Sequence, residues 1–387
     1  MNIQYISSTS SKDNNFVGVK INKDKIEIFH PEFLNFNHAN VQKKLQDVRD
    51  LLNIIYNTNL IEEHEFGGKN LSDVRLNRNL FNSYKWIIEF YLSGGNIKDW
   101  LSVKRTDYKG KINWRMTMSS YPKVIDDYFF YDKIVSKRLE LADISLVEIF
   151  NFCVNKALEN LGWLYNFQPN SQNLRSENLD NYISFVKKQL HYTNNERRKE
   201  LLLNMLSILI EVVSEKENYV TVFGTNNFNL VFEYMINLVF NNVENISDYY
   251  PNSWWELEGK IFGNSKLRPD AVLTYGSDVF LIDAKYYRYE TTHRSSDLPG
   301  TDSIQKQLTY QDHIKNVLGL NVVNNLFIVP NHSKEKVKYL GKAKACWRQV
   351  DNTINLFSIG LETLMELVNS SQKEKETTRK SIVQWFV

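Results

Sequence analysis

Two acidic residues and a lysine stand at the ends of consecutive apolar segments in the second half of the chain. Asp270 closes an Arg-Pro-Asp tripeptide, and Asp283 and Lys285 flank one alanine in Asp-Ala-Lys. Two carboxylates and a nearby ammonium group can hold a divalent metal ion and prepare a water molecule for attack on a phosphate. The spacing of these residue types therefore indicates phosphodiester chemistry, provided that the fold brings them together.

The residues between them are typical of a β-hairpin. The apolar β-formers of 271–275 and 279–282 flank a short Gly-Ser-Asp segment, which favours a tight turn between antiparallel strands. Such pairing brings Asp270 close to Asp283. Because side chains alternate along a strand, Asp283 and Lys285 should point to the same side.

Alternatively, the same residues have no catalytic role and are an exposed turn aspartate and an unrelated surface ion pair. Short patterns of common residues recur by chance. Against it, Leu281 and Ile282 belong to an apolar run that looks buried. Charged groups placed directly at the end of such a strand are costly without a partner or a metal ion.

A third carboxylate could come from either of two places. Glu233 lies inside an apolar helix predicted over about 227–243, where the solvent-facing stripe of an amphipathic helix would also explain it. Glu256 and Glu258 lie one predicted strand before Asp270, and an exposed strand face would explain both. The residue types alone leave the choice open.

Two neutral polar residues follow on the next predicted helix, near 302–318. Gln307 and Tyr310 are three residues apart and therefore neighbours on one helix face. An amide and a phenol can bind phosphate or orient a carboxylate, although a polar helix surface is the simpler explanation. No serine or cysteine nucleophile stands in a recognisable setting, and no Gly-rich phosphate loop occurs.

The patterns predict two domains. After a β-rich start at 1–35, helices are expected over most of residues 1–215, with an irregular basic and aromatic region at 98–138. Residues 216–387 read as a mixed α/β sheet flanked by helices, with strands near 254–262, 267–275, 278–286, 325–329 and 354–358, and a charged, mobile tail at 370–380.

Composition is that of an ordinary globular protein, with 42% hydrophobic residues and a net charge of +2 over 387 residues. A nucleic-acid surface would therefore have to be local. Cys153 and Cys346 have no zinc-ligand spacing and are expected to be buried thiols in a reducing compartment. The start of the chain lacks a secretory pattern and no run is apolar enough to span a bilayer, which predicts a cytoplasmic protein.

A local basic and aromatic segment in the first domain is the candidate DNA surface. Cations interleaved with aromatic rings suit phosphate contact and base stacking, although a solvated basic loop is nearly as good an explanation. The residues are Lys104, Arg105, Lys109, Lys111, Trp114 and Arg115.

The order of these features resembles the PD-(D/E)xK nuclease superfamily over roughly 217–360: a helix glutamate, an aspartate on one strand, Asp-x-Lys on the next, then a helix with Gln-x-x-Tyr. Within it, the chain is most similar to LlaJI-type restriction endonucleases, relatives of the McrC nuclease subunit. The segments 223–228, leading to 231–233, and 110–117 carry that likeness.

The resemblance implies a restriction-endonuclease-like domain at 216–387 with a Mg²⁺ site. Asp270, Asp283 and the main-chain carbonyl of Ala284 would be ligands, and Glu233 would complete the acidic shell. Lys285 would orient or help deprotonate the attacking water, or shield the transition-state charge.

By the same resemblance, Gln307 and Tyr310 would support the nucleotide backbone, and the domain at 1–215 would bind DNA or a partner. The expected activity is cleavage of double-stranded DNA in an anti-phage restriction system. A separate McrB-like AAA+ GTPase and a methyltransferase would be its partners. The alternatives are a catalytically silent DNA-binding or assembly subunit with the nuclease fold, and a nuclease of repair, transposition or RNA processing.

Overall fold

The computed structural model divides into two compact units, formed by residues 1–64 with 220–387 (unit 1) and by residues 65–219 (unit 2). The described residues are 2–8, 15–22, 25–36, 40–58, 80–95, 100–106, 111–119, 121–126, 128–141, 146–168, 179–214, 221–263, 266–320, 323–334, 337–350 and 352–386.

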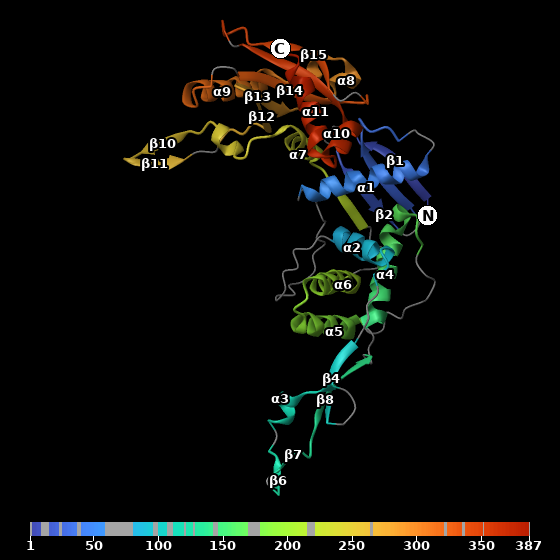
Figure 1. The fold of residues 1–387 in the computed structure, drawn as a ribbon. Helices are drawn as coiled ribbons and strands as arrows, with labels where there is room; N and C mark the ends of the chain where they lie inside the picture. The colour runs from blue at the N-terminus through green and yellow to red at the C-terminus, as the bar shows by residue number, and fades with distance from the viewer. Residues whose placement is uncertain are drawn as a thin grey trace. The chain divides into compact units, whose positions relative to one another are not determined.

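A five-stranded mixed sheet forms the centre of unit 1 (Figure 1). Its strands, in spatial order, are β12 (Ala271–Tyr275), β13 (Asp278–Ala284), β14 (Val323–Asn331), β16 (Thr353–Gly360) and β15 (Lys338–Lys344). The two outer pairs are antiparallel, and the inner pairs are parallel. Long apolar runs let the inner strands be buried on both faces.

Helices lie against both faces of this sheet. On one face Leu281 of β13 packs with Tyr310 and Ile314 of α9 (Thr301–Val317). On the other face the Phe280 ring lies 5.3 Å from that of Phe386, which follows α11. The remaining helices of this region are α7 (Phe228–Phe240), the short α8 (Tyr289–Thr292), α10 (Leu361–Val368) and α11 (Gln372–Val383), with 3-10 turns η3 (Ile246–Tyr249) and η4 (Ser295–Asp297). The predicted fold class, a mixed sheet flanked by helices, is confirmed.

A second sheet in unit 1 joins the start of the chain to its second half. Its order is β1 (Asn2–Ser8), β3 (Lys25–Pro31), β2 (Val17–Ile21) and β9 (Thr221–Thr225), and α1 (Val41–Asn57) contacts β9. Gly18 pairs with Gly224, and a Cβ atom on either glycine would overlap the backbone of the opposite strand. The predicted division at 216 therefore differs from the structure, which places residues 1–64 with the C-terminal unit. Local patterns do not show such a long-range strand pairing.

The described residues of unit 2 combine several helices with small sheets. The helices are α2 (Leu80–Leu92), α4 (Leu146–Leu161), α5 (Leu179–Tyr192) and α6 (Glu196–Ser214), with the 3-10 turn η1 (Gly162–Tyr165). The region predicted to be irregular holds β4 (Trp100–Thr106), β5 (Lys111–Ile112), α3 (Trp114–Thr117), β6 (Lys123–Ile125), β7 (Tyr128–Phe130) and β8 (Val135–Leu141). The strands β5, β6 and β7 have only two or three residues, too few for a hydrophobic period to reveal them. The longer β4 and β8 were missed although each has seven residues.

Three further expectations are corrected. The strand predicted at 254–262 is a hairpin of β10 (Trp254–Leu257) and β11 (Lys260–Gly263), because Glu258 and Gly259 have positive φ angles and reverse the chain. The tail predicted to be mobile contains α11. Its buried Arg379 donates hydrogen bonds to the main-chain carbonyls of Val239, in α7, and of Asn241, just after α7. Cys346 is exposed, whereas Cys153 is buried as expected.

Among the described residues, no helix has both the length and the apolar character that a membrane crossing requires.

Candidate active site

Asp270 and Asp283 are brought together by the β12–β13 hairpin, as their spacing predicts. The backbone N–H of Asp270 donates to the carbonyl of Ile282 at 3.1 Å. The Asp270 carboxylate in turn accepts a hydrogen bond from the backbone N–H of Ala284, with Oδ2 at 2.6 Å. Asp270 is thus bound through both its main chain and its side chain to the strand that carries Asp283 and Lys285.

Asp283 is a buried carboxylate with two ammonium groups beside it. Its side chain is 2% exposed and forms an ion pair with Lys285, whose side chain is 15% exposed. Lys306 of α9 approaches the other oxygen, with Nζ 3.5 Å from Oδ1. In the part of the chain that the structure describes, neither Asp283 oxygen accepts a hydrogen bond. The negative charge of Asp283 is therefore offset by the positive charges of Lys285 and Lys306.

Burial and neighbouring carboxylates disfavour the ionised forms of Asp270 and Glu233. Burial first, and then the charges of Asp283 and Glu233, raise the pKa of Asp270 to about 7. Burial and the charge of Asp283 also raise the pKa of Glu233, and Lys285 and Lys306 oppose that rise. Titratable groups with such strongly perturbed pKa values gather at functional sites more often than elsewhere.

Of the competing carboxylates, the structure brings Glu233 to this cluster. Glu256 and Glu258 lie instead on the exposed β10–β11 hairpin. That hairpin is a separate two-stranded sheet with no ladder to β12.

Gln307 and Tyr310 are fully buried and bind the backbone around the carboxylates. Gln307 Nε2 donates to the carbonyl of Leu281 at 2.8 Å, and the Tyr310 hydroxyl donates to the carbonyl of Arg268 at 2.7 Å. One bond holds β13 two residues before Asp283, and the other holds the residues leading to Asp270. Both side chains therefore position the strands. Their support of the nucleotide backbone, which the resemblance implies, stays a prediction.

Two further side chains, Lys306 and Asn237, contact the cluster and were not predicted from the sequence. Lys306 directly precedes Gln307, and its ammonium lies 5.7 Å from the centre of the Tyr310 ring. A Lys-Gln-x-x-Tyr pattern on the helix could have indicated that Lys306 belongs to the site. Asn237 of α7 donates from Nδ2 to the Asp270 carbonyl at 2.7 Å. Nothing in the local sequence distinguishes this asparagine from other polar residues.

The donor chemistry of the cluster fits a hard divalent cation. Asp283 offers two buried oxygens. The ionised form of Asp270 is disfavoured by burial and then by its carboxylate neighbours, a cost that a cation would relieve. Among the described residues, no group of three His, Cys, Asp or Glu side chains is arranged to hold a metal ion. A bound ion would therefore rely on fewer carboxylates, supplemented by main-chain oxygen and water, as Mg²⁺ sites commonly do.

The residues of the candidate DNA surface lie in unit 2. Lys111, Trp114 and Arg115 are exposed, and the Trp114 side chain is 58% exposed. Lys104 and Arg105 lie on β4, and the strand register places Lys104 and Lys111 on either side of Lys137.

The remaining residue of that surface, Lys109, lies outside the described residues.

Comparison with known proteins gives one family. Residues 16–360 match the model of the LlaJI restriction endonuclease family. No curated protein matches the chain. A solved structure, described as a refined half-complex from a tetradecameric assembly of Thermococcus gammatolerans McrB AAA+ hexamers with bound McrC, is similar at 15% identity and a TM-score of 0.46, over 96% of this chain and 83% of that chain. Because the family match extends over most of both units, the chain belongs to the LlaJI restriction endonuclease family.

Proposed function

We propose that the protein is a Mg²⁺-dependent DNA endonuclease of the PD-(D/E)xK type that acts in a restriction system. The observation that carries the proposal is the pairing of Asp270 and Asp283 on adjacent strands, with Lys285 against the buried Asp283 carboxylate. Family membership supports the same reading. The ordered set of residues, rather than any one of them, supports phosphodiester hydrolysis.

Each side chain has a role that follows from its contacts. Asp270, Asp283 and the main-chain carbonyl of Ala284 would hold Mg²⁺, and Glu233 would add negative charge beside them without binding the ion directly. When bound, the ion lowers the pKa of a coordinated water and offsets negative charge on the phosphate. Lys285 is held at Asp283, where its ammonium can orient the attacking water and stabilise developing charge.

Gln307 and Tyr310 act through the backbone. Their bonds to the carbonyls of Leu281 and Arg268 keep the two aspartates at a fixed separation. A displacement of about 1 Å in such a site can lower a rate by about a hundredfold.

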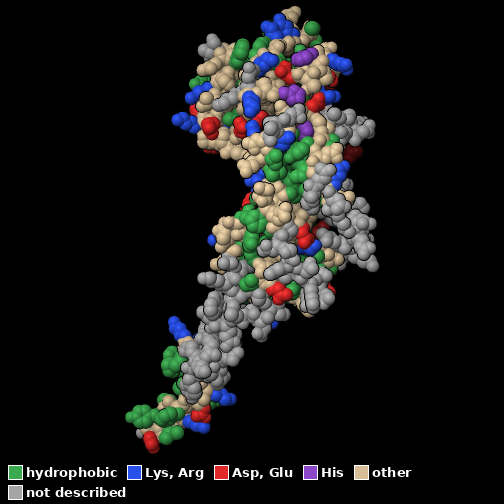
Figure 2. All heavy atoms as spheres, turned by 90° about the vertical axis from the view of Figure 1, so that its right-hand side faces the viewer, with side chains coloured by type: hydrophobic (Ala, Val, Ile, Leu, Met, Phe, Trp, Pro, Cys, Tyr) green, Lys and Arg blue, Asp and Glu red, His purple; other side chains and the backbone are tan. Residues whose placement is uncertain are grey.

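Unit 2 supplies the surfaces for DNA and for a partner in this proposal. Its exposed Lys111, Trp114 and Arg115 suit a nucleic-acid backbone with neighbouring bases. Apolar side chains are exposed on the β6–β7 hairpin, among them Val124 and Phe129, and Figure 2 shows hydrophobic side chains gathered at that end of the unit. An exposed apolar patch marks a protein-binding surface, and an McrB-like AAA+ GTPase is the partner we propose for it.

The direct test is incubation of double-stranded DNA with the protein and Mg²⁺, with and without the AAA+ subunit and GTP. Wild-type protein should cut DNA, and Asp283→Ala should not. Glu256→Gln, which removes a carboxylate from the exposed β10–β11 hairpin, is the matched control and should cut normally. DNA binding without cleavage under every condition would identify the chain as a catalytically silent subunit.

A further inference from the structure

A pocket of about 600 Å³ lies in unit 1 beside the candidate active site. It is lined by the end of β1, the start of β2, the start of α7, the segment after β13 and the turn before α9. The lining residues that matter here are Asn15, Asn226, Asn229, Tyr287, Arg288 and Asp297. None of them belongs to the carboxylate cluster.

The pocket and the cluster share the same three elements. Asn229 lines the pocket and is four residues before Glu233 on α7, so the two occupy the same helix face one turn apart. Tyr286 lines the pocket and directly follows Lys285. Gly300, also in the lining, is the N-cap of the helix that carries Lys306. A ligand that contacts Asn229 would therefore lie about one helical turn from Glu233 along α7.

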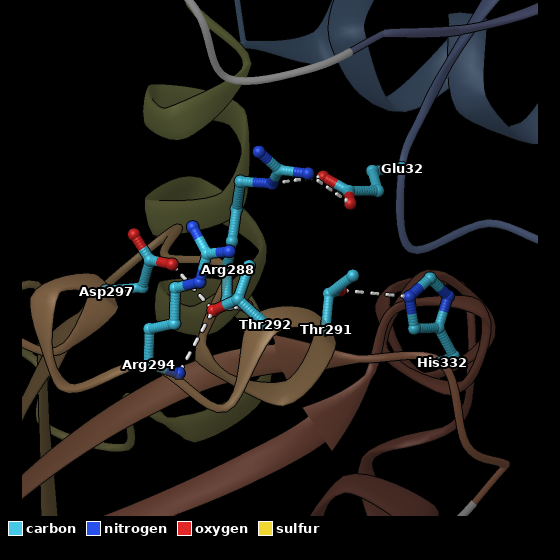
Figure 3. Close-up of polar contacts among 7 residues, drawn as sticks. All are labelled: Glu32, Arg288, Thr291, Thr292, Arg294, Asp297 and His332. Atoms are coloured by element: carbon cyan, nitrogen blue, oxygen red, sulfur yellow. Dashed lines mark hydrogen bonds and ion pairs between the residues drawn. The ribbon is translucent and has the colours of Figure 1, made fainter.

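The two charged side chains in the lining both contact neighbouring side chains. Arg288 donates from Nε and one terminal nitrogen to the two oxygens of Glu32, at 2.7 and 2.8 Å. Asp297 accepts a hydrogen bond from the Thr292 hydroxyl at 2.6 Å. Figure 3 shows both contacts, with the Arg288 side chain directed at Glu32. An arginine engaged in this bidentate way has little charge to offer a phosphate.

The rest of the lining suits a planar, neutral ligand with hydrogen-bonding edges. Asn15 and Asn229 carry carboxamides, the side chains that read base edges most directly after arginine. Asn15 already donates from Nδ2 to the main-chain carbonyl of Asn226 at 2.9 Å, so Asn229 is the amide on which the argument rests. Aromatic rings supply the apolar walls: Phe228 and Tyr286 pack edge to face at 5.3 Å, and Tyr287 is 37% exposed. A nucleobase combines both requirements, with a π-face for the rings and polar edges for the amides.

We propose that this pocket binds a nucleobase of the DNA substrate, turned out of the base stack, from a nucleotide adjacent to the cleaved bond. The inference deepens the proposed nuclease function and rests on it for the identity of the substrate. The helical turn between Asn229 and Glu233 is about 5.4 Å, which is on the scale of one nucleotide along a strand. Enzymes that hold a base outside the duplex recognise it in the same way, by its edge and by stacking.

The first test measures binding of the four free deoxynucleosides to the full chain by saturation-transfer NMR. Wild-type protein should bind at least one of them with a Kd in the millimolar range, about what one stacked and hydrogen-bonded base provides. Ser296→Trp, which fills the pocket from η4, should weaken that binding about tenfold or more. Ser295→Trp adds the same ring one residue away, at an exposed position outside the lining, and should bind as wild type.

Asn229→Leu provides a second variant on a different element and should also weaken binding. Absence of deoxynucleoside binding by wild-type protein, or equal binding by the two tryptophan variants, would overturn the proposal. This readout needs no cleavage, so it separates failure of the pocket from failure of the nuclease assignment.

The second test combines the variants with modified DNA. Once the cut position of wild-type protein is mapped, each flanking nucleotide is replaced in turn by an abasic analogue. One replacement should slow wild-type cleavage about tenfold or more and should slow Ser296→Trp no further, since that variant has already lost the interaction. If the abasic replacement slows Ser296→Trp by the same factor as it slows wild-type protein, the base does not occupy this pocket. A wild-type protein that cuts no DNA would refute the proposed function and leave the nucleoside result to decide on the pocket.

Discussion

The carboxylate of Asp270 accepts a hydrogen bond from the backbone N–H of Ala284, the residue between Asp283 and Lys285. One aspartate therefore fixes the peptide that carries the other two members of the cluster. The contact explains why the Arg-Pro-Asp and Asp-Ala-Lys segments act as one unit although 12 residues separate the two aspartates. Any change at Asp270 is expected to move Asp283 and Lys285 as well.

Loss of the buried carboxylate should abolish most of the activity. Asp283→Asn keeps the side-chain volume but removes the charge that faces Lys285 and Lys306. We expect the rate of DNA cleavage at saturating Mg²⁺ to fall by about a hundredfold or more. Gel assays of the cleavage rate beside Glu256→Gln provide the measurement. An Asp283→Asn enzyme as fast as that control would contradict the assignment.

Stability should depend on pH through Asp270. Its pKa is raised from 3.8 to about 7 in the folded protein, chiefly by burial and then by Asp283 and Glu233. From about pH 4 to about pH 7 the folded state holds a proton that the unfolded state has released, so the free energy of unfolding falls as the pH rises through this window. Below it, this stabilisation is fully present.

Thermal unfolding without divalent ions should therefore show Tm decreasing across the window for wild-type protein and changing less for Asp270→Asn. At pH values above this window, added Mg²⁺ should raise the Tm of wild-type protein and have little effect on the Tm of Asp270→Asn. A variant with the same pH dependence as wild type would show that Asp270 does not titrate there.

The lysine of α9 should contribute to catalysis. Lys306→Met removes the ammonium at 3.5 Å from Asp283 Oδ1, and we expect kcat to fall about tenfold with a smaller change in KM. Lys306→Arg should restore part of the activity because it retains the charge. Lys342→Met on the edge strand β15 changes an exposed lysine in the same way and serves as the control. Equal rates for the two methionine variants would exclude a role for Lys306.

The basic segment of unit 2 should contact phosphates. Charge reversal at Lys109 and Lys111 should weaken binding to duplex DNA of any sequence. It should also lower the slope of log affinity against log salt by about two, one unit for each lost contact. Fluorescence anisotropy over a salt series measures both quantities, with Lys373→Glu on α11 as a control. Unchanged affinity in the double variant would show that Lys109 and Lys111 do not contact DNA phosphates.

The β6–β7 hairpin should bind the AAA+ partner. Val124→Ser together with Phe129→Ser removes apolar surface from two exposed side chains, 64% and 69% accessible. We expect affinity for the partner to fall about tenfold or more, with DNA binding by the isolated chain unchanged. Analytical ultracentrifugation of the mixture, or calorimetry, checks the first expectation. If the double variant still assembles as tightly as wild type, the partner binds elsewhere.

The sequence predicted the hairpin of the two aspartates because its signals are local: apolar alternation, a Gly-containing turn and charges at the strand end. The helices predicted at 227–243 and 302–318 agree within a few residues with α7 and α9 for the same reason, since a 3.6-residue period persists over several turns. The fold class and the family, both carried by the order of several motifs, are confirmed.

What the sequence did not reveal depends on contacts between distant segments. The pairing of β2 with β9, and the approach of Lys306 to Asp283, join residues with no common local pattern. The burial of Gln307 and Tyr310 was not predicted either, because polar side chains are usually exposed. Both are buried because they donate to main-chain carbonyls on other elements. The roles of the individual site residues remain predictions.

The ladder between Val19 and Phe223 has a consequence for how the protein is made. The first strands leave the ribosome without their partner strand, and all of residues 65–219 must be synthesised before β9 follows. At ordinary rates of translation that interval is on the order of ten seconds or more, during which the edge of β2 stays open to other chains. A recombinant fragment beginning at residue 216 would have the converse defect, with β9 lacking its neighbour, so expression trials should retain the N-terminus.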